Sequence, residues 1–361
     1  MRQWYSMTVQ AFENSRLASA WNLYRTPSAK AKEMDKPKAV AVHLPISGSP
    51  MGAPIGTLSA RLPMVQRGMS ELQTLRIFYR ISSGGYAKEK PFYITKEACL
   101  TNFIGALLVY CRSTEFKNVK VDFHILCDAC TPALHKFVVG AVKILRHRAT
   151  ALQLKLTVAC TSSSYGNGAE SFRHVFAVAL STVPSPSDCN TAIYFVEDDY
   201  LHVPTGISVV MGGLELAPYA TGYDHPDKYT AACLGAVALG GSTGTLAAHG
   251  EGGGIVLCGP DRHYKTTHTT TMTFAAALST LRADASIISA FVANTHPDDF
   301  GLFVTLSACS SRVLVSPLPA ASTHGETMYL SPYIAWNIIG QRASDEAGAL
   351  IKAIDTEKNS T

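Results

Sequence analysis

Between residues 75 and 200, short apolar runs alternate with longer amphipathic segments. The short runs are rich in β-branched and aromatic residues, as is typical of strands, and the longer segments repeat their apolar positions at helical spacing. The pattern predicts, in chain order, strand 75–82, helix 94–111, strand 119–128, helix 132–148, strand 152–160, helix 168–183 and strand 192–200. Such alternation favours an α/β fold with a mostly parallel central sheet flanked by helices.

Three other segments differ from this pattern. Residues 1–74 are rich in Pro, Ser, Gly and Lys, and we expect a basic, poorly ordered extension. Residues 230–254 consist mainly of small residues, which predicts an insertion-like loop, and residues 341–361 are expected to form a polar tail. We therefore expect a single folded domain over residues 75–340.

Composition narrows the possible partners. The chain has 361 residues, 47% of them hydrophobic, which is enough apolar content for a sizeable core. Its net charge of +4 comes from residues 1–74, so we expect a near-neutral domain that binds no nucleic acid. We also expect no transmembrane segment, because residues 229–248 lack charge but are interrupted by Gly, Ser and Thr, whereas a membrane span needs about 20 strongly apolar residues. Peripheral contact with a membrane stays open.

The nine cysteines are scattered along the chain rather than arranged as a disulfide framework. We interpret them as reduced thiols and expect a cytoplasmic protein. The acid-poor N-terminal extension leaves organellar targeting open.

Three consecutive carboxylates, Glu197, Asp198 and Asp199, follow the apolar run 192–196. Carboxylates at a buried strand end repel one another, and leaving them unpaired would cost several kcal/mol. A Mg²⁺ or Mn²⁺ ion prefers oxygen ligands and would remove this cost while binding a diphosphate. The alternative is a solvated acidic turn that ends the strand.

Polar residues also end two of the other predicted strands. Arg80 and Ser82 end the first strand, and Asp128 ends the second. Ligands of parallel α/β sheets bind at the carboxyl ends of the strands, so these side chains are candidates for the same site as the acids.

Three later segments carry further candidate chemistry. Arg262 and Lys265 precede a Thr-rich run and suit phosphate contacts, or else form a solvated loop. His324 lies in a loop fixed by Pro and Gly, as a ligand or as a structural histidine. Asp298 and Asp299 precede an apolar helical run and suit a general base, or else cap that helix.

Several common enzyme motifs are missing from the sequence. It contains no Walker loop or HExxH motif, no G-x-S-x-G nucleophile elbow at the end of a predicted strand, and no G-x-G-x-x-G after the first predicted strand. Covalent hydrolases, P-loop enzymes and dinucleotide-binding folds are therefore unsupported.

A family resemblance rests on segments that occur in order between residues 75 and 340. They are RIFYRIS (76–82), KEK (88–90), TKEACLTNF (95–103), DFHILCDACT (122–131), GNGAESFRHVFAVAL (166–180), YFVEDDYLHVP (194–204), YDHPDKY (223–229), RHYKTTHTTTMTFA (262–275), DDFGLF (298–303) and SPLPAASTHGE (316–326). As a set, they resemble a family of bacterial and viral-type glycosyltransferases with the GT-A fold. The resemblance implies a nucleotide-binding N-terminal half and an acceptor-side C-terminal half.

The resemblance also implies residue roles. The metal would be held by Glu197, Asp199 and His324, with Asp199 the most direct ligand, and Asp198 would lie nearer the ribose or the donor sugar. The catalytic base would be Asp299 or Asp298, with Asp299 favoured. The remaining donor-binding residues would be Arg80, Ser82, Asp128, Asn167 and Ser171, and Arg262 and Lys265 would help to stabilise the leaving diphosphate. One departure is Glu170, a carboxylate near the helix start where the family pattern suggests a small or polar residue.

The function implied is transfer of a sugar from a nucleotide-sugar donor to a hydroxyl of a glycan, lipid-linked or protein acceptor. The reaction would need Mn²⁺ or Mg²⁺ and would invert the anomeric centre. Two alternatives stay open: a non-catalytic nucleotide- or sugar-binding module on the same fold, and a metal-dependent phosphohydrolase that uses the same acids.

Overall fold

The computed structural model describes residues 41–42, 71–84, 89–224, 256–259, 262–294, 296–310, 312–325 and 334–358. The chain divides into two units, Met1–Lys38 and Ala39–Thr361, and every described residue belongs to the second. The insertion expected at 230–254, most of the extension expected at 1–74 and most of the segment 223–229 lie outside the described residues.

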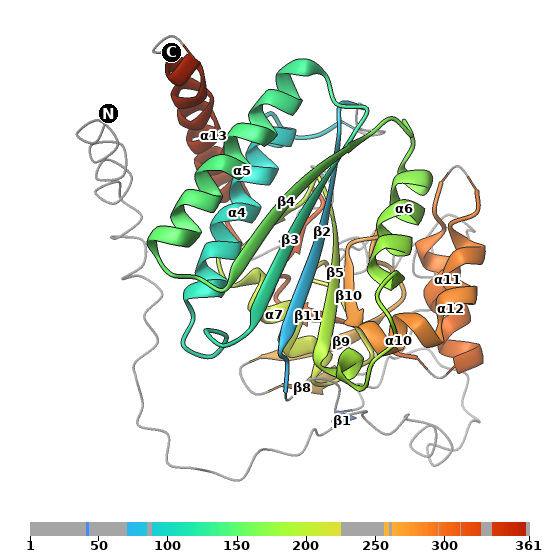
Figure 1. Ribbon diagram of the computed structural model, residues 1–361. Helices are drawn as coiled ribbons and strands as arrows, with labels where there is room; N and C mark the ends of the chain where they lie inside the picture. The colour runs from blue at the N-terminus through green and yellow to red at the C-terminus, as the bar shows by residue number, and fades with distance from the viewer. Residues whose placement is uncertain are drawn as a thin grey trace, which may run out of the picture. The chain divides into compact units, whose positions relative to one another are not determined.

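The predicted α/β fold with a central sheet flanked by helices is confirmed (Figure 1). The four predicted strands form one parallel block in the order β4-β3-β2-β5: β2 is Thr74–Ser82, β3 is Lys120–Asp128, β4 is Leu156–Ser163 and β5 is Thr191–Glu197. The helices between them are α4 (Lys96–Arg112), α5 (Pro132–Ala151) and α6 (Gly168–Leu180). The third strand begins later than the expected residue 152, because α5 continues to Ala151.

Beyond β5 the sheet is mixed rather than parallel. The order continues β5-β10-β7-β11-β9-β8-β1, and in this part only β7 and β11 pair in parallel among the described strands. These strands are β1 (Ala41–Val42), β7 (Tyr219–Ala220), β8 (Val256–Cys258), β9 (His263–Thr267), β10 (Phe274–Ala277) and β11 (Leu314–Leu318). Parallel neighbours need a crossover connection, usually a helix, whereas antiparallel neighbours do not. The regular alternation of strands and helices therefore ends near residue 200, where the antiparallel pairing begins.

The remaining elements are short, apart from one C-terminal helix. They are the 3₁₀ helix η2 (Pro186–Asn190), β6 (Leu201–His202), α7 (Gly206–Leu214), α10 (Leu278–Ala283), α11 (Ala285–Phe291), α12 (Asp299–Ser310), β12 (Ser322–Thr323) and α13 (Trp336–Lys358). Strands β6 and β12 pair as a separate two-stranded sheet.

The central sheet separates two apolar cores. One core lies under α4, α5 and α7, and Phe103 of α4 packs there against the rings of Tyr79 and Phe123 at 5.3 and 5.6 Å between centroids. The other lies under α6, α10, α11 and α12, which cover the opposite face (Figure 1). Alternate residues of β2 enter the two cores, as Ile77 and Phe78 show.

The segment expected as a polar tail is helical up to Lys358 and packs against α4. Ala343 and Ala347 lie one helical turn apart and are buried, as is Trp336 at the start of α13. The partly buried Ile339, Leu350 and Ile354 continue this face at helical spacing, so the segment carries an apolar stripe that the expectation of a polar tail overlooked.

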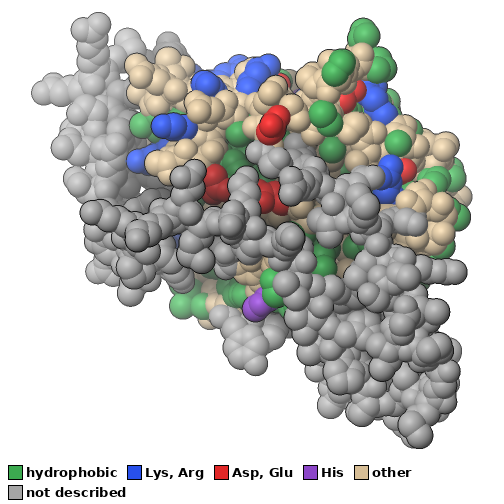
Figure 2. All heavy atoms as spheres, turned by 90° about the horizontal axis from the view of Figure 1, so that it is seen from below, with side chains coloured by type: hydrophobic (Ala, Val, Ile, Leu, Met, Phe, Trp, Pro, Cys, Tyr) green, Lys and Arg blue, Asp and Glu red, His purple; other side chains and the backbone are tan. Residues whose placement is uncertain are grey.

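Charged side chains of both signs and free cysteines characterise the described residues. Figure 2 shows basic and acidic side chains interspersed with apolar ones on the described part of one face. The described cysteines are all free thiols. Among the described residues, no helix combines the length and the apolar character needed to cross a bilayer.

Candidate functional site

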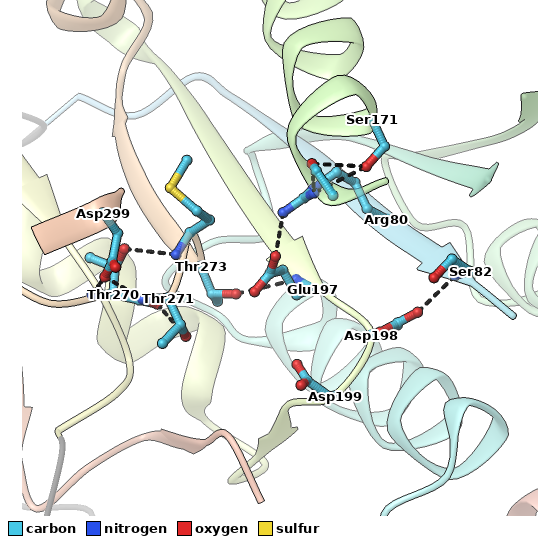
Figure 3. Close-up of polar contacts among 12 residues, drawn as sticks. Arg80, Ser82, Ser171, Glu197, Asp198, Asp199, Thr270, Thr271, Thr273 and Asp299 are labelled. Carbon is cyan, nitrogen blue, oxygen red and sulfur yellow. Dashed lines mark hydrogen bonds and ion pairs between the residues drawn. The ribbon is translucent and has the colours of Figure 1, made fainter. Parts of the chain in front are cut away.

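The carboxyl ends of β2, β3 and β5 meet at one edge of the sheet. The register places Arg80 opposite Glu197 and Ser82 opposite Asp128. The polar strand ends predicted from the sequence are therefore neighbours, and Figure 3 shows Arg80, Ser82 and the acids around this edge.

Each of the three consecutive acids has its own side-chain cation. Arg80 Nη2 lies 2.7 Å from Glu197 Oε1. Lys96 Nζ lies 2.7 Å from Asp198 Oδ1, and the Ser82 backbone N–H donates to Asp198 Oδ2 at 2.7 Å. The repulsion that the sequence predicts for these carboxylates is thus largely cancelled by cations of the protein itself.

Asp199 has two nitrogen partners. Lys90 Nζ lies 3.1 Å and His324 Nε2 lies 2.9 Å from Asp199 Oδ2, and Lys90 Nζ also donates to the His324 carbonyl at 2.8 Å. The other oxygen, Asp199 Oδ1, is buried and has no hydrogen-bond partner among the described residues, in a residue that is 9% exposed.

Glu197, Asp199 and His324 form the group that suits a metal ion. One ligand atom from each lies within 4.8 Å of the others. His324 reaches the acids because β12 pairs with β6, the strand that follows them directly. Asn102 of α4 fixes β6 in turn, because its side chain bonds the His202 backbone N–H at 2.6 Å and carbonyl at 3.1 Å.

Burial and charge move the pKa values of the acids apart. Burial raises the pKa of Glu197, and Arg80 opposes this shift. Burial likewise raises the pKa of Asp198 against the opposing charge of Lys96. Burial also acts to raise the pKa of Asp199, but His324 and Lys90 outweigh it, so the net shift is downward and this carboxylate stays ionised.

Arg80 and Ser171 tie the acids to α6. Arg80 Nη1 donates to the Gly168 carbonyl at 2.9 Å and contacts Ser171 Oγ at 3.2 Å, and its guanidinium lies 5.2 Å from the Phe172 ring centroid. Arg80 thereby holds β2, β5 and the start of α6 together. Its contact with a nucleoside, which the resemblance implies, stays a prediction.

Asp128 and Asn167 support the loop that precedes α6. Asp128 Oδ1 accepts from Ser163 Oγ at 2.9 Å and from the Tyr165 backbone N–H at 2.7 Å. Asn167 caps α6, because its Oδ1 accepts from the Glu170 backbone N–H at 2.8 Å. These contacts support the loop, and the predicted role of both residues in donor binding stays a prediction.

Asp298 and Asp299 each bond to backbone amides. Asp299 Oδ2 accepts from the N–H groups of Thr270 and Thr271, both at 2.7 Å, as Figure 3 shows. Asp298 Oδ1 accepts from the Gly301 N–H at 2.8 Å at the start of α12. Such contacts are those expected if the two aspartates cap backbone N–H groups. The role of either residue as a base stays a prediction.

The region of Asp299 is linked to the acids through Tyr200. The Tyr200 hydroxyl donates to the Thr270 carbonyl at 3.1 Å, and the Tyr200 ring lies 5.2 Å from that of His324. Burial raises the pKa of Tyr200, and nearby carboxylates add to this shift. Tyr200 therefore stays a neutral hydrogen-bond donor between the two acidic segments.

Arg262 directly precedes β9, and Lys265 lies on it. Lys265 Nζ lies 2.9 Å from Asp224 Oδ1, and the neighbouring Tyr223 ring lies 6.1 Å from the His324 ring. Lys265 thus belongs to the His324 side of the site. Arg262 lines a surface hollow with His263 and Pro319.

Sequence reasoning did not identify Lys90 and Lys96 as site residues. Lys90 precedes α4 and Lys96 is its first residue, and both reach acids that are more than 100 residues away. The only sequence signal was their position in the segments KEK and TKEACLTNF, which contribute to the family resemblance.

Comparison with known proteins gives a weak fold-level likeness. No family model and no curated protein matches the chain. Similar solved structures include a mycobacterial protein, with 12% identity and a TM-score of 0.32 over 68% of this chain. The bifunctional glycosyltransferase WbbM in its apo form has 9% identity and a TM-score of 0.36 over 67% of this chain. The galactosyltransferase LgtC with donor and acceptor sugar analogues has 11% identity and a TM-score of 0.33 over 76% of this chain. The chain spans 65% of the mycobacterial protein, 38% of WbbM and 95% of LgtC. These scores are too low to support a conclusion about function.

Proposed function

We propose that this chain is a metal-dependent glycosyltransferase of the GT-A type, which transfers a sugar from a nucleotide-sugar donor to a hydroxyl acceptor. The observation that carries the proposal is the group of Glu197, Asp199 and His324 at the carboxyl end of a parallel strand block. This edge is where α/β sheets bind their ligands. The motif segments that resemble glycosyltransferases of this fold supply the reaction type.

The residues present fit a divalent cation. Two carboxylates and one imidazole are ligands that Mn²⁺ accepts, and Mg²⁺ would rely more on the two carboxylates. The buried Asp199 Oδ1, which has no partner among the described residues, is an oxygen that a cation would satisfy. A bound cation would neutralise negative charge on the diphosphate leaving group.

The other residues of the site position the ligands. Arg80 fixes Glu197 through the ion pair at 2.7 Å, and Lys96 fixes Asp198. Asp198 thereby holds the end of β2 through the Ser82 N–H, where the donor's ribose or sugar would bind. Held in this way before the substrate arrives, the groups lose little freedom on binding.

Deprotonation of the acceptor hydroxyl is assigned to Asp299, with Asp298 as the alternative. One oxygen of Asp299 accepts the two amides of residues 270 and 271, so the carboxylate is held in a fixed orientation. If neither acid acts as a base, the same site would belong to a non-catalytic binding module, which would bind a donor without transferring its sugar.

Calorimetry with Mn²⁺ and a panel of nucleoside diphosphates tests the metal site. The wild type is expected to bind one nucleoside diphosphate only when Mn²⁺ is present, and Asp199→Asn is expected to abolish this binding. The matched control is Asp122→Asn, a carboxylate on β3 that pairs with Lys120 at the surface. Unchanged affinity in Asp199→Asn would refute the metal role of Asp199.

A further inference from the structure

The ammonium group of Lys90 lies between two of the candidate metal ligands. Its Nζ is 3.1 Å from Asp199 Oδ2 and 2.8 Å from the His324 carbonyl oxygen, and the side chain is only 5% exposed. Asp199 and His324 belong to the group that suits a metal ion. The protein therefore already supplies a buried positive charge at the carboxylate that a metal ion would share.

The protein already pairs every acid of the site with a cation, without any added ion. Arg80, Lys96 and Lys90 contact Glu197, Asp198 and Asp199 in turn, and His324 also contacts Asp199. A divalent cation would add two positive charges beside an ammonium group that water screens poorly. Like charges at such a distance in a buried site repel strongly.

Lys90 is the cation of the three that a metal would displace. Arg80 is fixed by further bonds to Gly168 and Ser171 on α6. Lys96 pairs with Asp198, which does not belong to the metal-ligand group. Lys90 pairs with Asp199, a member of that group, through a single ammonium group on a flexible side chain.

We propose that Lys90 is an internal counter-ion of Asp199 that the metal ion displaces, and that this exchange couples metal binding to diphosphate binding. The proposal rests on the proposed metal site. The metal alone must overcome the repulsion of Lys90, so it binds weakly. A diphosphate brings negative charge that offsets the metal and accepts the displaced ammonium, so the two bind better together, and the coupling is reciprocal.

The test measures Mn²⁺ affinity, which does not depend on turnover. Free Mn²⁺ is followed by electron paramagnetic resonance in the wild type, Lys90→Met, Lys90→Arg and Lys96→Met, with and without UDP or GDP. The Mn²⁺–nucleotide complex in solution is measured separately and subtracted. Lys90→Met keeps a side chain of similar length without charge, Lys90→Arg keeps the charge, and Lys96→Met removes a cation from an acid outside the ligand group.

Lys90→Met is expected to bind Mn²⁺ alone at least tenfold more tightly than the wild type and to show less enhancement by the nucleotide. Lys90→Arg is expected to restore wild-type behaviour, and Lys96→Met to give a smaller increase than Lys90→Met. A purely structural role of Lys90 would instead weaken Mn²⁺ binding in Lys90→Met.

Two negative results are distinguishable. If the wild type binds Mn²⁺ and Lys90→Met binds it no more tightly, the displacement of Lys90 is refuted and the metal site stands. If neither protein binds Mn²⁺ with or without a nucleotide, the metal site of the proposed function is refuted, and this proposal with it.

Discussion

The two acidic segments at 197–199 and 298–299 look alike in the sequence but are neutralised in different ways. In the first, each carboxylate pairs with a lysine, arginine or histidine side chain, and Asp199 keeps one buried oxygen without a partner among the described residues. In the second, each aspartate accepts bonds from backbone amides. Hydrogen bonds from backbone N–H groups are typical of carboxylates that cap loops and helices. Ion pairs around a carboxylate that keeps a buried oxygen available as a ligand are typical of a binding site. The comparison makes the first segment the better metal site and leaves the base role of the second to be tested.

The largest effect is expected for Asp299→Asn. The amide side chain keeps an oxygen for the N–H groups of Thr270 and Thr271 but cannot take a proton. If Asp299 is the base, transfer falls by about two to four orders of magnitude while the donor affinity and the melting temperature stay near those of the wild type. The measurement is single-turnover transfer together with donor titration. Full transfer activity in Asp299→Asn would show that Asp299 is not the base and that it only caps the N–H groups of Thr270 and Thr271.

The next effect concerns the ion pair of Arg80 and Glu197. Arg80→Met leaves Glu197 without its cation beside a buried strand end and is expected to lower the free energy of unfolding by about 3–5 kcal/mol. The double variant Arg80→Met/Glu197→Met is expected to recover part of this loss. Urea unfolding measures both, with Lys136→Met as the control, because Lys136 and Asp355 form an exposed pair worth at most about 1 kcal/mol. A loss in Arg80→Met no larger than in the control would show that Glu197 does not need its partner.

The smallest effect is the acid sensitivity of His202, which lies on β6 just after the first acidic segment. Burial lowers the pKa of His202 to about 3, so the folded state keeps it neutral where the unfolded chain, with a pKa of about 6.5, binds a proton. The unfolded state then holds more protons, and stability falls as the pH drops below about 6.5, by about 1.4 kcal/mol per pH unit until the folded pKa is reached. Urea unfolding of His202→Gln between pH 7 and 5 should show a shallower decline than the wild type. Parallel declines would mean that other groups cause the acid sensitivity.

The parallel block could be predicted because its strands are long and apolar. Each of β2, β3 and β5 is a run of seven to nine residues that enters two cores, and the cap of α4 at Thr95 is a local feature of the sequence. The mixed half could not be predicted, because β7 has only two residues and is defined by its neighbours rather than by its own pattern. The helix α13 was missed for a different reason, because its apolar residues Trp336, Ile339, Leu350 and Ile354 are widely spaced among polar ones.

The acids of the candidate site and their partners Arg80 and His324 were visible in the sequence, but the partners Lys90 and Lys96 were not. Three carboxylates after an apolar run mark a strand end. The distance of Lys90 and Lys96 from these acids depends on how β2, α4 and β5 pack. Short polar residues such as Asn167 bond to nearby backbone, and their sequence context does not separate this role from ligand binding.

The most direct test of the account is anomalous diffraction at the manganese absorption edge from crystals grown with Mn²⁺ and a nucleoside diphosphate. The account predicts one anomalous peak in contact with Glu197, Asp199 and His324, next to the diphosphate, with Lys90 moved away from Asp199. A diphosphate bound elsewhere, with Lys90 still on Asp199 and no peak at the three residues, would contradict it.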